Sequence, residues 1–108
     1  MEGDVCVIGL RGELDLAGAP ALEVELARVM RDSDLRAIVV DLSGLDFMDS
    51  SGLRAVVVAD QRAAAARVRF ALVRGGEPVH RVFDITRMTE RLTWVSSPAE
   101  LIDGGEGA

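Results

Sequence analysis

Short apolar runs alternate along this chain with segments whose apolar residues recur every three or four positions. The run Ala37-Ile38-Val39-Val40 is typical of a buried strand, whereas Leu22, Leu26 and Val29 fall on one face of a helix. Strands are predicted over residues 5–10, 35–42, 68–73 and 92–95, and helices over residues 20–30, 52–66, from 77 onward and 99–102. This alternation predicts an α/β fold, with a mainly parallel or mixed sheet of four to five strands and about four helices.

The chain of 108 residues has the length of one domain, and no linker or repeat divides it. A single domain is therefore predicted over residues 1–108, with a frayed tail of low complexity over residues 103–108. Ser43-Gly44 is predicted to turn the chain after the second strand. Because functional groups gather at the carboxyl ends of parallel strands, the segment after this strand is the predicted functional region.

The charge balance excludes several classes of function. Twelve basic residues, all of them Arg, face 18 acidic ones, and the net charge of -6 argues against nucleic-acid binding. Without Lys the chain contains no P-loop. No apolar run approaches the roughly 18 residues that span a bilayer, and the acidic N-terminus lacks the basic region of a signal peptide. A cytoplasmic location without a membrane partner is therefore expected.

Candidate catalytic groups are few. A Ser-His-Asp triad needs Ser50 or Ser51 together with His80, the one histidine of the chain. However, the two serines do not stand in the Gly-x-Ser-x-Gly elbow that exposes a nucleophile. His80 follows Pro78 inside a helical pattern, and it is predicted to be an exposed helix residue.

Candidate metal and redox groups are equally few. Asp41, Asp46 and Asp49 offer carboxylate oxygens that suit a divalent cation, but their spacing matches no EF-hand loop. Asp is also an ordinary turn residue. Cys6 is the only cysteine, so no internal disulfide forms, and its aliphatic neighbours predict a small core residue. No metal and no cofactor are expected.

The segment Asp49-Ser50-Ser51-Gly52 stands where a predicted buried strand meets a predicted helix. One interpretation is a plain N-cap, in which a side-chain oxygen accepts a free helix N–H. Ser51, one residue nearer the helix body, is the serine whose hydroxyl we expect to act in this way. A second interpretation is a regulatory phosphorylation site, because free N–H groups and the helix dipole favour an anion there. The residues alone leave both interpretations open.

The residues from Asp41 to Leu53, which read DLSGLDFMDSSGL, resemble the signature of the STAS domain family of bacterial anti-sigma factor antagonists. Gly12-Glu13-Leu14-Asp15 resembles a second, shorter landmark of that family, and residues 81–86 and 97–101 match its later pattern. The resemblance extends from about Val5 to Ile102, so it covers nearly the whole chain. It implies a single STAS-like domain.

The resemblance also implies a mechanism of partner switching. The unmodified antagonist binds an anti-sigma factor and so releases a sigma factor. The anti-sigma factor is also an ATP-dependent serine kinase, which phosphorylates Ser50 and ends the binding, and a PP2C-type phosphatase restores the serine. This chain is then no enzyme. The implied partner-binding residues are Asp15, Asp49, Ser50, Ser51, Gly52, Leu53 and Arg54.

The sequence departs from the family pattern in three places. The family usually has an extra N-terminal strand, but only Met1 to Asp4 precede Val5 here. Arg54, expected in the first turn of the helix, replaces a residue that is often small, and Arg87 replaces a common Gly. We expect these departures to affect the choice of partner more than the fold.

Two other functions are compatible with the same residues. One is a structural STAS subunit in a stressosome-like scaffold or in a lipid-transport complex. The other is a small hydrolase that uses Ser50 or Ser51 as its nucleophile. The single histidine and the missing elbow argue against the hydrolase.

Overall fold

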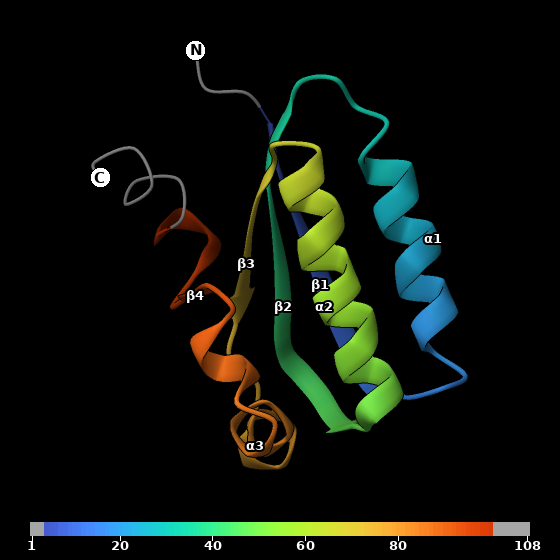
Figure 1. Cartoon of the computed structure of the whole chain (residues 1–108), viewed down its shortest axis with the longest axis vertical. Coiled ribbons are helices and arrows are strands. Elements are labelled where there is room, and N and C mark those ends of the chain that lie inside the picture. The colour runs from blue at the N-terminus through green and yellow to red at the C-terminus, as the bar shows by residue number, and fades with distance from the viewer. Residues whose placement is uncertain (1–3, 101–108) are drawn as a thin grey trace.

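A computed structural model describes residues 4–100 (Figure 1). The strands are β1 (Asp4–Leu14), β2 (Leu35–Met48), β3 (Arg69–Val73) and β4 (Trp94–Val95). The helices are α1 (Ala19–Val29), α2 (Ser50–Ala65), α3 (Glu77–Ile85) and the short 3-10 helix η1 (Met88–Glu90). The strands pair in the order β1-β2-β3-β4, and all three pairs are parallel. The predicted α/β fold with a parallel four-stranded sheet is therefore confirmed.

The centre of the sheet is the first half of β2. Ile38, Val39, Val40 and Leu42 have no exposed surface, and β1 and β3 flank this part of the strand. Figure 1 shows α1 and α2 side by side in one layer over one face of the sheet. Each fully buried Val, Ile or Leu stabilises the fold by about 1.5–3 kcal/mol relative to an exposed one. The main core therefore lies between this strand and the two helices.

The second half of β2 corrects the sequence prediction. The chain does not turn at Ser43-Gly44, because β2 continues to Met48 and keeps pairing with β1. Register shifts interrupt the pairing twice along this stretch, and each inserts an extra residue into β2. A Cβ on Gly44 would lie 2.6 Å from the carbonyl oxygen of Leu10, so the absence of a side chain allows the two backbones to approach. We name the paired residues 11–14 of β1 and 43–48 of β2 the distal ladder.

His80 is a second correction, because only 5% of its surface is exposed. Its ring packs edge-on against Trp94, with 4.9 Å between the ring centroids, and Phe83 packs edge-on against the same indole at 5.0 Å. Nε2 of His80 lies 3.4 Å from Oδ1 of Asp84. The prediction placed His80 beside the apolar stripe of α3, but Trp94 of β4 covers this face of the helix and buries the ring.

The edges of the described region bear on the remaining predictions. β1 is an edge strand, and within residues 4–100 nothing pairs with it on the side away from β2. Cys6 is half-buried against the core, as predicted, and burial raises the pKa of its thiol. Residues 98–100 are helical, whereas the rest of the predicted last helix and the tail lie outside the described residues. Among the described helices, none has the length and apolarity that a membrane crossing requires.

Candidate functional site

Asp49 caps the N-terminus of α2. The backbone N–H of Gly52 donates to Oδ1 of Asp49 at 3.0 Å, and the N–H of Leu53 donates to the Asp49 carbonyl oxygen at 3.0 Å. Asp49 has the extended backbone of an N-cap residue, and its negative carboxylate interacts favourably with the positive end of the helix dipole. The cap is therefore Asp49, and the expectation that the Ser51 hydroxyl supplies it is wrong.

The N-terminus of α2 is pressed against the end of β1. The Asp49 N–H donates to the Leu14 carbonyl oxygen at 3.3 Å. A Cβ on Gly52 would lie only 2.2 Å from that same oxygen, which is closer than any side chain can approach. Gly52 is therefore required by the close approach of two backbones. It fixes the first turn of α2 to the distal ladder.

The predicted site residues after the cap divide into exposed and buried ones. Ser50 is exposed at the first position of α2, and Ser51 is half-buried. Gly52 is buried, and Leu53 belongs to the core with 8% of its surface exposed. Arg54 is exposed at the fifth helical position, in the second turn and not in the expected first turn, because α2 begins at Ser50. A partner approaching this end of the molecule therefore meets Ser50 first.

Asp15 shapes the loop that joins β1 to α1. Its Oδ1 accepts the N–H of Gly18 at 3.0 Å, and its carbonyl oxygen accepts the N–H of Ala19 at 2.8 Å. Because Asp15 directly follows Leu14, the turn that it closes begins beside the Asp49 cap. The structure thus brings Asp15 and the Asp49–Ser51 segment to the same end of the molecule, as the sequence predicted.

The residues required for other chemistry are not assembled here. In the described part of the chain, His80 makes no hydrogen bond to either serine, and its ring lies in the aromatic cluster around Trp94. Asp41 uses its carboxylate to accept the N–H of Ser43 at 2.9 Å. Over residues 4–100, carboxylates within ligand distance of one another occur at Asp4, Asp32 and Asp34, at the amino ends of the strands. The arrangement around Ser50 offers a hydroxyl for modification or contact.

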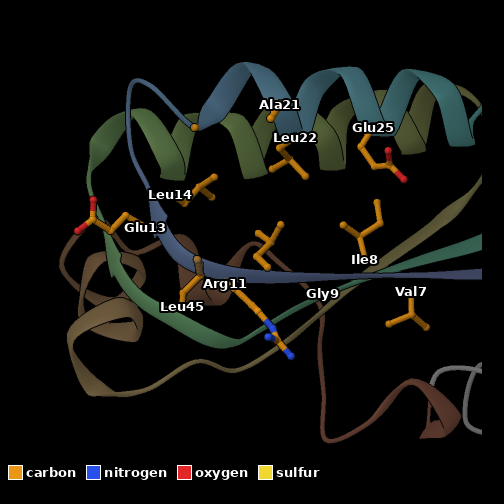
Figure 2. A pocket seen from close by; sticks show the side chains of 12 residues that line it. Val7, Ile8, Gly9, Arg11, Glu13, Leu14, Ala21, Leu22, Glu25 and Leu45 are labelled. Atoms are coloured by element: carbon orange, nitrogen blue, oxygen red, sulfur yellow. The ribbon is translucent and has the colours of Figure 1, made fainter.

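A groove of about 490 Å³ runs along β1 beside this site (Figure 2). Ile8 and Leu14 of β1 point up toward Leu22 of α1 and form its apolar interior, whereas Arg11 points to the opposite face of the sheet. Glu25 stands at one end of the groove and pairs with Arg28, whose guanidinium lowers the pKa of the Glu25 carboxyl. The groove contains no nucleophile, so we place the candidate function at Ser50.

The sequence analysis missed two exposed apolar side chains on the segments that adjoin the start of α2. Leu16, in the loop that Asp15 closes, is 75% exposed, and Phe47, near the end of β2, is 47% exposed. Phe47 pairs in register with Glu13 on the face of the distal ladder opposite Leu14. The available signal was an apolar residue in a polar loop and an aromatic residue next to the buried Met48.

Comparison with known proteins agrees with these features. Residues 2–100 match the STAS domain family. RsfB, an anti-sigma-F factor antagonist of Mycobacterium tuberculosis, is 29% identical over 103 residues, which are 95% of this chain and 83% of RsfB. These matches span the core, the distal ladder and the Ser50 segment alike.

Solved structures show the same fold. An anti-sigma factor antagonist from Mycobacterium paratuberculosis superposes with a TM-score of 0.80 at 27% identity, over 93% of this chain and 84% of that one. The anti-sigma factor antagonist SpoIIAA in its unphosphorylated form covers all of this chain, with 94% of its own length, a TM-score of 0.71 and 23% identity. The Bacillus SpoIIAA has also been solved in a phosphorylated form, with a TM-score of 0.67, 24% identity and coverage of 92% and 88%. This chain therefore belongs to the STAS domain family, and the relatives that it resembles include anti-sigma factor antagonists.

Proposed function

We propose that this protein is an anti-sigma factor antagonist controlled by phosphorylation of Ser50. The unmodified protein binds a cytoplasmic anti-sigma factor that is also a serine kinase, and this binding frees a sigma factor. Phosphorylation of Ser50 ends the binding, and a PP2C-type phosphatase restores it. The protein acts as a binding module and carries out no catalysis itself.

The observation that carries the proposal is that Asp49 and Ser50 have different roles at the start of α2. Asp49 makes the cap, so the exposed Ser50 hydroxyl is not needed for the helix. The first N–H groups of a helix have no acceptors within the helix, and together with the dipole they favour an anion. A phosphate on Ser50 is therefore compatible with the folded protein. The existence of SpoIIAA structures in both forms agrees with such a switch.

The switch acts through charge at the interface. A phosphoserine adds about -1.5 to -2 charges at neutral pH, next to the carboxylate of Asp49 that caps the same helix. Burying this charge against a partner without compensating groups costs several kcal/mol, and each 1.4 kcal/mol is a tenfold change in affinity. We expect phosphorylation to weaken binding at least about hundredfold.

The other residues of the site contribute in different ways. Gly52 and Leu53 are buried, so their contribution to binding is indirect, through the position of Ser50. Asp15 holds the neighbouring loop, and Ser51 borders the hydroxyl that is modified. Arg54 is exposed on the second turn and reaches outward, where it can contact the partner. Arg54→Ala keeps a helix-forming residue, so it should change partner affinity with little change in stability.

The test starts from native lysate of the source organism. The unphosphorylated protein, immobilised as bait, should retain a serine-kinase anti-sigma factor that mass spectrometry identifies. That kinase and ATP should then add one phosphate to the wild type and to Ser51→Ala, but none to Ser50→Ala. Calorimetric titration should show tight binding only by the unmodified forms. Recovery of no such kinase, or phosphate on Ser51, would contradict the proposal.

A further inference from the structure

Five large apolar side chains are strongly exposed in the described part of the chain, and two of them lie on the segments that hold the start of α2. The five are Val7, Leu16, Val24, Phe47 and Ile85. Val24 lies on α1 and Ile85 ends α3, so neither belongs to the distal ladder or to its adjoining loop. Single exposed apolar residues are common. A pair on the two segments that hold an exposed hydroxyl requires a closer look.

The exposure of Phe47 is a local property of its place in the sheet. Earlier in the same strand, Val39 has no exposed surface because β1 and β3 flank it and further apolar residues pack on it. Over the described residues, the stretch of β2 around Phe47 pairs with β1 alone. Its ring is therefore left half uncovered at the end of the strand, three residues before Ser50.

Leu16 is presented from the other element of the site. The turn closed by the Asp15 carboxylate holds this residue two positions after Leu14. The Leu14 carbonyl oxygen is the atom that accepts the Asp49 N–H and packs on Gly52. Leu16 and Phe47 are thus fixed to the start of α2 through β1 and β2, respectively.

The charges nearest this pair in the chain are mostly acidic, with Arg11 and Arg54 as the exposed cations of the same region. Glu13, the register partner of Phe47, and Asp46 are both exposed, and the Asp49 carboxylate lies at the cap. A complementary surface has apolar pockets bordered by basic side chains. Large apolar anchors inside a polar rim are the arrangement that carries most binding energy in protein interfaces.

We infer that Leu16 and Phe47, on the two segments that hold the start of α2, are the apolar anchors by which this protein docks on its anti-sigma factor. This inference rests on the proposed function and names the contact surface for it. The anchors hold the partner next to the serine, so that a phosphate on Ser50 adds its charge at the contact, where it is costly to bury.

The experiment compares four exposed apolar residues in one assay. Leu16→Ser and Phe47→Ser remove the proposed anchors, and Val24→Ser and Ile85→Ser remove side chains of similar exposure elsewhere, at 69% and 73%. The probe is the serine-kinase anti-sigma factor that the wild-type bait retains, titrated against each unphosphorylated variant. We expect each anchor variant to bind at least about tenfold more weakly and each control to stay within about twofold of the wild type. Thermal melts verify that all four remain folded.

A photo-crosslinking series distinguishes the inference from the proposed function. A benzophenone amino acid at position 16 or 47 should crosslink to the kinase, and the same group at position 24 or 85 should not. If the kinase binds but crosslinks from 24 or 85, or if the anchor variants bind as tightly as the wild type, the inference is wrong and the proposed function stands. If the wild type retains no serine-kinase anti-sigma factor, both are wrong.

Discussion

The two halves of β2 differ in what surrounds them. Residues 35–42 lie between two parallel neighbours and under two helices, and Val39, Val40 and Leu42 are fully buried. In the described chain, residues 43–48 pair with β1 alone and leave Asp46 and Phe47 exposed, and two of the three register shifts fall at or just before them. One strand therefore supplies both the centre of the core and the support of the exposed serine. Side-chain packing dominates in the first half, whereas the second adds only Leu45 and Met48 to the core and is held mainly by backbone contact with β1.

The two halves of β2 therefore have different roles: the first stabilises the fold, and the second positions Ser50 at the surface. The core half contributes most of the buried apolar surface, so changes there affect unfolding first. The distal ladder positions Ser50 through contacts to Leu14, where the Asp49 N–H and Gly52 both meet one carbonyl oxygen. Changes there alter the position of Ser50 relative to a partner, with a smaller effect on the global fold.

The largest effect is expected from truncation of the core half. Leu42→Ala removes a side chain with no exposed surface and leaves a cavity, which costs about 2–5 kcal/mol of unfolding free energy. The folded fraction should still bind the anti-sigma factor with wild-type affinity. Urea denaturation and calorimetric titration at low temperature measure the two quantities. A stable variant with impaired binding would contradict the separation.

Gly52→Ala should affect both properties. The new Cβ would overlap the Leu14 carbonyl oxygen, so the start of α2 has to move, at a cost of about 1–3 kcal/mol and with loss of partner binding. Gly9→Ala is the matched control, because a Cβ there meets nothing within 4 Å and the residue lies in β1, the strand that ends at Leu14. Denaturation midpoints and titrations of both variants decide the matter. Equal behaviour of the two glycines would show that the close approach at Leu14 is not needed.

Two substitutions at Asp49 separate its role as the helix cap from the effect of its negative charge. Asp49→Ala loses the bond to the Gly52 N–H and about 1 kcal/mol of stability. Asp49→Asn keeps an equally good cap without the carboxylate, so its stability should stay close to that of the wild type. If the acidic rim contributes to docking, Asn should nevertheless bind the anti-sigma factor more weakly. Wild-type affinity of the Asn variant would restrict Asp49 to the role of a cap.

The same contrast explains what the sequence predicts well. The first half of β2 is a continuous apolar run, and its type and place are predicted correctly because burial on both faces leaves a direct pattern. The helices α1 and α2 follow from their spacing in the same way. The parallel sheet follows from the alternation of these elements.

The distal ladder leaves no such pattern. Its β1 stretch is mostly polar, its β2 stretch carries two bulges, and each contains a Gly, so Ser43-Gly44 resembles a turn when it is considered alone. The pairing exists only because the two stretches meet in space. His80 was misplaced for a related reason: the Trp94 that buries it comes from a distant strand. The family resemblance points to Ser50, but only the structure shows that Asp49 is the residue that caps α2.

The smallest effect is expected at the proposed switch itself. Ser50→Ala should change the unfolding free energy by less than about 0.5 kcal/mol, because the side chain is exposed and Asp49 already caps α2. Ser51→Ala, half-buried one position later, is the matched control for phosphorylation. The phosphorylated wild type should melt at or slightly above the temperature of the unmodified protein, since a charge near the helix N-terminus contributes about 0.3–1 kcal/mol of stability. Calorimetric melts of these forms, beside their titrations, give the comparison. If phosphorylation unfolded the protein, the loss of binding would come from the fold, and the charge at the interface would not be its cause.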